Sequence, residues 1–229
     1  MLSRFADRRA AGRALADRLR ELAGSGALAD AVVLGLPRGG VVVAAEVAAA
    51  LGAPLDVVPV RKLGLPGHAE LAMGAIAAAG GSVETVRVDA VLVSSPVAPG
   101  VFDAVREREM VELHRRATAY RAGCPPVPLT GRPVVLCDDG MATGATMRAA
   151  VAAVRREAPA SITVAVPVGS PRVCDELAGD VDRVVCLRAP ASFRAVGQVY
   201  RDFAATQDDE VLAVLDAARA RGAGAPPTV

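Results

Sequence analysis

Two neighbouring carboxylates followed by a glycine-rich turn are the residues in this sequence best suited to bind and transform a ligand. Asp138 and Asp139 end an apolar run, and Gly140 and Gly144 follow in the string VVLCDDGMATGATM, residues 134–147. The backbone amides of such a turn converge on one point, and the N-terminus of the following helix adds partial positive charge. Because glycine permits close backbone approach and positive φ, the turn can hold a phosphate group without a basic side chain.

The two acids would complete a site for a sugar phosphate. Side chains alternate along a strand, so Asp138 and Asp139 would point apart unless the chain turns, which Gly140 allows. The pair could then accept hydrogen bonds from a vicinal diol and attract a divalent cation, while Thr143 and Thr146 donate to phosphate oxygens. A phosphate site beside a diol site describes a ribose 5-phosphate. The simpler alternative is a capped helix with two solvated acids in an ordinary strand-to-helix loop.

The whole string resembles the signature with which type I phosphoribosyltransferases bind phosphoribosyl diphosphate (PRPP). The resemblance implies transfer of 5-phosphoribosyl from PRPP to a nitrogenous base with release of pyrophosphate, as in nucleotide salvage. It implies a catalytic role for Asp138 and Asp139, and Mg²⁺ as a cofactor that these acids would reach through water. The residues that would bind the 5′-phosphate are Gly140, Ala142, Thr143, Gly144, Ala145 and Thr146.

A second segment, GLPRGG at residues 35–40, stands where this family keeps its pyrophosphate loop. The resemblance assigns Arg38, Gly39 and Gly40 to the pyrophosphate. The family often has a cis peptide bond there, which would lie between Pro37 and Arg38. By itself the segment is equally an ordinary turn between a strand and a helix, but its order and spacing relative to residues 134–147 support the resemblance.

Arg61 and Lys62 resemble the Arg-Lys pair that opens the mobile catalytic loop of orotate-type members. That loop carries a histidine and an acid, and His68 and Glu70 follow here at a looser spacing. Lys62 is the only lysine in the chain. Since lysine is a compact charge on a flexible stem, we expect Lys62 to be catalytic and, with Arg61 and Arg38, to neutralise the leaving pyrophosphate. The alternative is a surface lysine left by chance.

The stretch FRAVGQVYRDF, residues 193–203, resembles a segment of the hypoxanthine-guanine branch. The resemblance assigns Phe193 to stacking on the base and Asp202 to a metal ion; alternatively, these aromatic residues pack the closing helix. Two departures leave the acceptor open. Ala142 stands where that branch has an Asp for the ring nitrogen, as in the adenine and uracil branches, and residues 166–170 lack its lysine for the 6-oxo group.

Continuous apolar runs predict the strands that must position these residues. We expect strands over 31–36, 55–60, 133–139, 161–168 and 181–187, and helices over 4–23, 41–51, 102–120, 146–157, 171–177 and 209–221. Residues 61–82 favour a long loop with a hairpin through 73–79, residues 82–93 one or two short strands, and 124–133 a linker. The alternation predicts an α/β fold: a parallel sheet of about five strands flanked by helices, with a small hood over its C-terminal edge and the ligand at the carboxyl ends of the strands.

A length of 229 residues predicts a single domain, which we expect over 1–221. Within it we expect a core over 30–188 and a hood formed by 189–207 and the first helix, followed by a flexible tail over 222–229. The net charge of +1 gives no reason to expect nucleic acid or a membrane as partner. No two cysteines form a C-x-x-C pair, which argues against zinc and fits reduced thiols in a cytoplasmic protein. We expect PRPP and a small base as ligands, and a homodimer. The rival from another class is a PRPP- or nucleotide-binding regulator without turnover.

Overall fold

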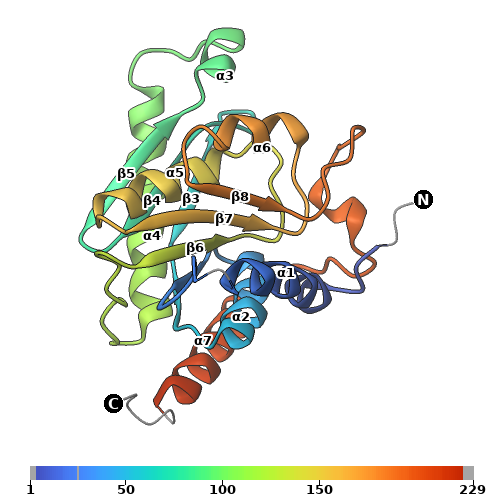
Figure 1. The fold of residues 1–229 in the computed structure, drawn as a ribbon. Coiled ribbons are helices and arrows are strands. Elements are labelled where there is room, and N and C mark those ends of the chain that lie inside the picture. The colour runs from blue at the N-terminus through green and yellow to red at the C-terminus, as the bar shows by residue number, and fades with distance from the viewer. Residues whose placement is uncertain (1–3, 25, 224–229) are drawn as a thin grey trace.

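A five-stranded parallel sheet forms the centre of the molecule (Figure 1). The computed structural model describes residues 4–24 and 26–223, with the backbone alone at residues 69, 70, 222 and 223. The strands of this sheet are β1 (Val32–Gly35), β2 (Leu55–Val57), β6 (Pro133–Cys137), β7 (Ser161–Val166) and β8 (Arg183–Cys186). They lie in the order β2-β1-β6-β7-β8, and every neighbouring pair is parallel. The predicted α/β class and five-strand sheet are confirmed.

Helices cover both faces of this sheet because its strands are apolar on both sides. Helices α1 (Arg8–Ala23), α2 (Gly39–Leu51) and α7 (Asp208–Ala223) form one apolar core with Val33 and Val135. Helices α5 (Ala145–Arg156) and α6 (Pro171–Leu177) form the other with Leu34 and Leu136. Successive strand residues thus enter different cores, as alternation along a strand requires.

A second, antiparallel sheet occupies the segment that the sequence assigned to a long loop. Strands β3 (Val60–Leu65), β4 (His68–Ala79) and β5 (Ser82–Arg87) pair in the order β3-β4-β5. The predicted loop over 61–82 is therefore wrong for most of its length. Residues 73–79, where a hairpin was expected, belong to the single strand β4, which pairs with β3 and β5. After β5, the short helix α3 (Asp89–Ser94) replaces the second short strand that the sequence allowed.

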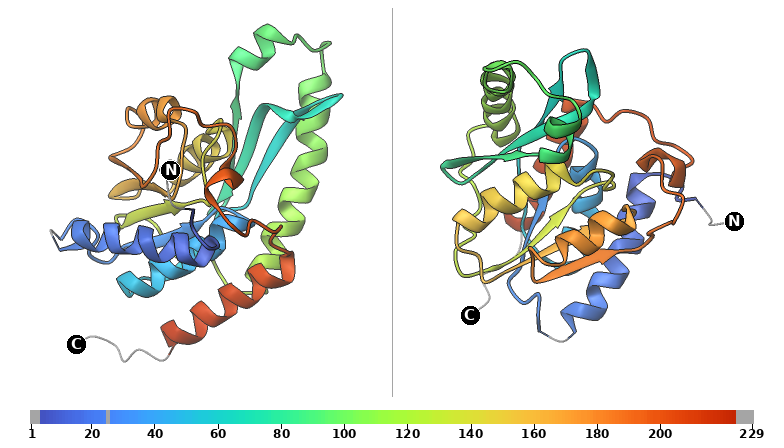
Figure 2. Two further views of the ribbon diagram at one scale, coloured as in Figure 1. Left: turned by 90° about the vertical axis from the view of Figure 1, so that its right-hand side faces the viewer. Right: turned by 90° about the horizontal axis from the view of Figure 1, so that it is seen from above.

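Packing on both faces explains why this segment forms a sheet. Strand β4 is rich in alanine, which has low strand propensity, so the local sequence favours a loop. Ala75 and Ala77 belong to the apolar core of α5, whereas Met73 and Ile76 are fully buried in a cluster with residues of α4 (Val101–Arg121). Figure 2 shows α4 running along this sheet. Burial between two helices outweighs the local propensity.

The segment after β8 is irregular, as predicted, apart from the 3₁₀ helix η1 (Val196–Val199). The N-terminal residues pair with it: Phe5 N donates to Val199 O and Arg201 N donates to Phe5 O, both at 2.8 Å. Because residue 5 is held in this way, α1 begins at Arg8 rather than at residue 4. The division of the chain into core and hood stays a prediction.

The closing helix α7 is joined to α4 at its first residue, where Tyr120 Oη donates to Asp208 Oδ1 at 2.7 Å. The helix continues through Ala223, so the first two residues of the expected tail are helical; residues 224–229 lie outside the described part of the chain. Over residues 4–24 and 26–223, no helix combines the length and apolarity that crossing a membrane requires.

Candidate active site

The turn after β6 places the predicted phosphate loop at the carboxyl end of this central strand. Met141 N donates to Val168 O and Ser170 N donates to Met141 O, both at 2.9 Å, which fixes the turn beside the end of β7. Gly144 has a φ of +73° and caps α5. In the part of the chain that the structure describes, the backbone amides of 142–144 donate no hydrogen bond. These amides, at a helix N-terminus, are available to an anion.

Asp138 and Asp139 are in direct contact through the backbone. Asp138 Oδ1 accepts from the backbone N–H of Asp139 at 2.8 Å. Burial raises the pKa of Asp138 well above its usual range, and the negative charge of Asp139 adds to this shift. Burial also raises the pKa of Asp139, although a hydrogen bond from Arg8 opposes the shift. Negative charge is therefore costly here, and a cationic ligand is favoured.

Lys62 acts on this acid pair from strand β3, not from a loop. Its positive charge lowers the pKa of both Asp138 and Asp139. The expected loop position is wrong because Lys62 pairs with Ala75 of β4 in the antiparallel sheet. The Lys62 side chain is exposed and borders a cavity of about 580 Å³, which Thr146 of the predicted phosphate loop also lines.

The lining of this cavity suits an anion. It combines the turn after β1, strand β3, helix α4 and the first turn of α5. Its cationic side chains are Arg61, Lys62, Arg108 and Arg116, against the single carboxylate of Glu109. Arg61 is already paired, because its Nε and Nη2 donate to Glu109 Oε2 at 2.9 Å and 2.6 Å. The excess of positive charge attracts polyanions such as phosphates.

The predicted pyrophosphate loop lies directly against the acids. The peptide bond between Pro37 and Arg38 is cis, as the resemblance implied. A Cβ atom built on Gly39 would overlap Asp139 Oδ2, and one on Gly40 would lie 2.8 Å from Asp138 Cα. Glycine is therefore required at both positions by the close approach of the acid pair.

Arg8 and Tyr200 complete the surroundings of Asp139, and neither was predicted as a site residue. Arg8 Nε donates to Asp139 Oδ2 at 2.7 Å, and Tyr200 Oη donates to the backbone carbonyl of Asp139 at 2.6 Å. One sequence signal could have pointed to Arg8. It is the first residue of a helix with no acid in its first turn, where a positive charge opposes the helix dipole. A locally unfavourable charge of this kind needs a partner elsewhere in the fold.

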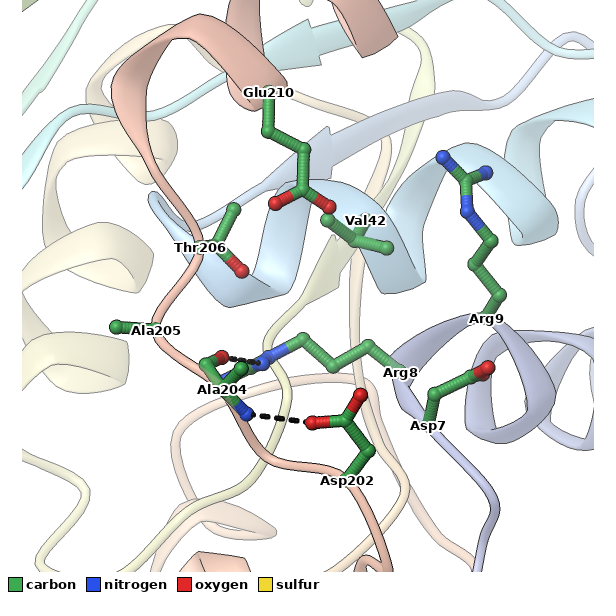
Figure 3. A pocket seen from close by; sticks show the side chains of 9 residues that line it. All are labelled: Asp7, Arg8, Arg9, Val42, Asp202, Ala204, Ala205, Thr206 and Glu210. Carbon is green, nitrogen blue, oxygen red and sulfur yellow. Dashed lines mark hydrogen bonds between the residues drawn. The ribbon is translucent and has the colours of Figure 1, made fainter.

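The residues predicted to bind the base and a metal lie in the segment after β8. Phe193 is half-buried against a cluster of aromatic and aliphatic residues. Asp202 is exposed, its Oδ1 accepts from Ala204 N at 3.0 Å, and it borders a second pocket of about 230 Å³ with Arg8 (Figure 3). Among residues 4–24 and 26–223, no three His, Cys, Asp or Glu side chains are grouped to hold a metal ion. The roles of Phe193 and Asp202 stay predictions.

Arg38 lies near a chain segment that the sequence did not connect with it, whereas His68 and Glu70 lie on strand β4. Arg38 is the N-cap residue of α2, and its Nη1 lies 3.9 Å from Asp208 Oδ1 at the start of α7. His68 begins β4 and is exposed. Glu70 is also on β4, where the structure describes its backbone alone.

Comparison with known proteins decides the family. The phosphoribosyl transferase domain matches residues 106–204. Two curated proteins of Mycobacterium tuberculosis, from strains CDC 1551 and H37Rv, each named "Putative phosphoribosyl transferase", are 50% identical over 216 residues, which is 93% of this chain and 47% of theirs. The crystal structure of TT1426 from Thermus thermophilus is 45% identical and covers 93% of this chain and 97% of its own, with a TM-score of 0.74. The chain belongs to the phosphoribosyltransferase family.

The acid pair and the turn that follows it lie within the residues that match the phosphoribosyl transferase domain. Residues 106–204 include β6, Asp138, Asp139 and the phosphate loop, as well as Phe193 and Asp202. The segment with Arg38 and strand β3 with Lys62 precede this region, so their assignment depends on the geometry described above. The chain spans about half the length of the curated relatives that it matches.

Proposed function

We propose that this chain transfers the 5-phosphoribosyl group of PRPP to a nitrogenous base and releases pyrophosphate, with Mg²⁺ as cofactor. One observation carries the proposal: a pair of half-buried acids, Asp138 and Asp139, lies between a turn with available amides and a glycine loop that touches both acids. In this arrangement the turn at 140–146 binds the 5′-phosphate, the acids bind the ribose hydroxyls, and the loop at 38–40 receives the pyrophosphate.

The charges fit the bond changes of this reaction. The acceptor nitrogen attacks C1 of the ribose as the bond from C1 to the pyrophosphate oxygen breaks, so positive charge grows on the ribose and negative charge on the leaving group. Asp138 and Asp139 lie where positive charge is favoured, since burial raises the pKa of both. Lys62 and Arg38 neutralise the departing pyrophosphate. Preorganised charges of this kind stabilise the transition state more than the bound substrate.

The acids also fit a magnesium ion shared with the substrate. Mg²⁺ retains several waters in proteins and binds through one or two carboxylates together with substrate phosphates. Two adjacent carboxylates, Asp138 and Asp139, with no third acid grouped beside them in the described residues, match that pattern. They would hold the ion through water, and the ion would neutralise part of the pyrophosphate charge. Asp202 remains a proposed further contact from the C-terminal segment.

Three positions bear on the choice of acceptor. Ala142 supplies no carboxylate for a ring nitrogen, and residues 166–170 supply no lysine for a 6-oxo group, so a 6-oxopurine has no matching partners there. Phe193 is half-buried, with ring surface left to stack on a planar base. A planar heterocycle without a need for either charged partner fits these residues best.

A panel experiment tests the proposal. The protein is incubated with PRPP, Mg²⁺ and each of adenine, hypoxanthine, guanine, xanthine, uracil and orotate, and pyrophosphate release is measured. The control is the double variant Asp138→Asn, Asp139→Asn, which keeps the shape of the pair without its charge. Base-dependent release that the control loses supports the transferase. PRPP binding by calorimetry without release for any base supports the regulator instead, and absence of both contradicts the proposal.

A further inference from the structure

The N-terminal segment fixes the position of Arg8. Asp7 Oδ1 accepts from Ala10 N at 2.7 Å and caps α1, which sets where the helix begins. Residues 5 and 6 form three backbone hydrogen bonds of 2.8–3.0 Å with residues 199–202. Arg8 therefore leaves the backbone at a point that is anchored on both sides, next to the segment that follows β8.

The guanidinium of Arg8 is in turn held by three different groups. Its Nε donates to Asp139 Oδ2 at 2.7 Å, its Nη1 donates to Ala204 O at 2.6 Å, and its Cζ lies 4.0 Å from the centroid of the Phe203 ring. Figure 3 shows the side chain reaching from α1 to the Ala204 carbonyl. Only 13% of the Arg8 side chain and 17% of the Asp139 side chain are exposed, so the ion pair is largely shielded from water.

The pyrophosphate loop leaves no free space beside this ion pair. A Cβ atom on Gly39 would overlap Asp139 Oδ2 and would lie 2.5 Å from Arg8 Nε. On the backbone side, Tyr200 holds the carbonyl of Asp139. The Asp139 carboxylate is thus enclosed by the loop, by Arg8 and by Asp138, and it has little freedom to rotate.

We propose that Arg8 is a positioning residue that holds the Asp139 carboxylate in the orientation needed to accept the ribose hydroxyls of PRPP, an inference that rests on the proposed function. Arg8 acts through Asp139 and does not touch the substrate. A carboxylate fixed in advance by a guanidinium loses little rotational freedom when the diol binds, which favours binding and the oriented reaction. Without Arg8, Asp139 keeps its partly buried site but loses the cation that orients it.

Three variants separate this role from a general effect of charge. Arg8→Ala removes the guanidinium, Arg8→Lys keeps a charge that can reach one oxygen, and Arg9→Ala is the control. Arg9 is the next residue of α1, and its half-exposed side chain pairs with Glu46 at 3.3 Å instead. We expect Arg8→Ala to weaken PRPP binding in Mg²⁺ about tenfold by calorimetry, a change of ~1.4 kcal/mol. Arg8→Lys should recover part of the loss, and Arg9→Ala should stay within about twofold of wild type.

A double-mutant cycle with Asp139→Asn shows whether Arg8 acts through Asp139. In the Asp139→Asn background, Arg8→Ala should cause no further loss of PRPP affinity. Melting temperatures establish that each variant folds, and Arg8→Gln, which keeps a donor of similar reach, replaces Arg8→Ala if that variant does not. Unchanged affinity in the Arg8 variants, or a full tenfold loss that persists with Asp139→Asn, would overturn the inference. Absence of PRPP binding by the wild-type protein would instead contradict the proposed function.

Discussion

Arg61 and Glu109 form an ion pair in the cavity that Lys62 and Thr146 also line. Two nitrogens of Arg61, Nε and Nη2, donate to one oxygen, Glu109 Oε2, at 2.9 Å and 2.6 Å. The Glu109 side chain is 13% exposed, and Arg108 Nη2 approaches its other oxygen at 3.3 Å. The arginine expected to neutralise a pyrophosphate therefore has a carboxylate of its own chain as partner. A pyrophosphate that enters this cavity must compete with Glu109 for Arg61.

Glu109→Gln should strengthen PRPP binding. The amide keeps the size of the side chain but removes the competing negative charge, so Arg61 becomes available to the pyrophosphate. We expect the dissociation constant for PRPP in Mg²⁺ to fall about three- to tenfold by calorimetry, or ~0.7–1.4 kcal/mol. Glu107→Gln is the matched control, because Glu107 lies on the same helix but is exposed and does not line the cavity. Weaker binding by Glu109→Gln would mean that Glu109 orients Arg61 for the substrate instead.

Lys62→Ala should lower turnover with a smaller effect on PRPP affinity. The positive charge of Lys62 lowers the pKa of both acids, and a flexible stem would let the ammonium follow a departing pyrophosphate. We expect turnover to fall at least about tenfold, equivalent to ~1.4 kcal/mol of barrier, and Lys62→Arg to recover part of it. Rates of pyrophosphate release provide the measurement, with Arg18→Ala on the exposed side of α1 as the control. Wild-type turnover by Lys62→Ala would leave Lys62 as a surface lysine.

Gly39→Ala should disable the site through the acids. The added methyl group would overlap Asp139 Oδ2 and approach Arg8 Nε, so that the ion pair or the pyrophosphate loop must move. We expect at least about a hundredfold loss of PRPP affinity, ~2.7 kcal/mol, together with a lower melting temperature. Gly81→Ala in the turn between β4 and β5 is the control, because a Cβ atom there meets nothing within 4 Å. Equal PRPP affinity and equal melting temperature in the two variants would show that the loop can move without affecting the site.

The central sheet and the turn after β6 could be predicted because their signals are local. Strands β1 and β6 are continuous apolar runs, and the acids and glycines that follow β6 are neighbours in the chain. Strand β4 could not be predicted in the same way. Its alanines are poor strand formers, and it becomes a strand because helices α4 and α5 enclose it.

The ion pairs of the site are the part that the sequence could not supply. Arg8 and Asp139 are 131 residues apart, and Arg61 and Glu109 are 48 apart. Pairs at such separations depend on how the helices and the two sheets pack, and no local periodicity records them. The only local trace is the unfavourable position of Arg8 in the first turn of α1.

Asp138→Asn should stabilise the protein at neutral and alkaline pH. Burial raises the pKa of Asp138 in the folded chain above the value of about 3.9 in an unfolded one. The contribution of the acid to stability is therefore fully present below the unfolded pKa and is lost as pH rises through the folded pKa. The asparagine avoids this loss and can still accept from Asp139 N. We expect a melting temperature about 2–4 °C above wild type at pH 8, as ~1 kcal/mol gives in a chain of this size.

The same comparison at acidic pH provides the internal check on Asp138. The difference between Asp138→Asn and wild type should shrink as pH falls toward 4, because the wild-type carboxyl is then protonated. Asp17→Asn on the exposed side of α1 is the control and should follow the wild type at every pH. A constant difference across the pH range would show that the effect does not arise from ionisation of Asp138.

Phe193 can distinguish base binding from packing, because its ring is half-buried and leaves some surface exposed. If the ring stacks on the acceptor, Phe193→Ala should raise the acceptor KM about tenfold, within the ~1–3 kcal/mol that stacking on a base contributes elsewhere. PRPP affinity should stay unchanged, since the sites proposed for the ribose and the phosphates lie at 138–146 and 38–40. Phe193→Leu distinguishes the two roles: it retains apolar volume for the cluster with Phe5 and Tyr200 but offers no aromatic face. A leucine variant with wild-type melting temperature and a raised KM supports stacking. If leucine restores both the melting temperature and the acceptor KM, Phe193 is a packing residue, and other residues of the site must bind the base.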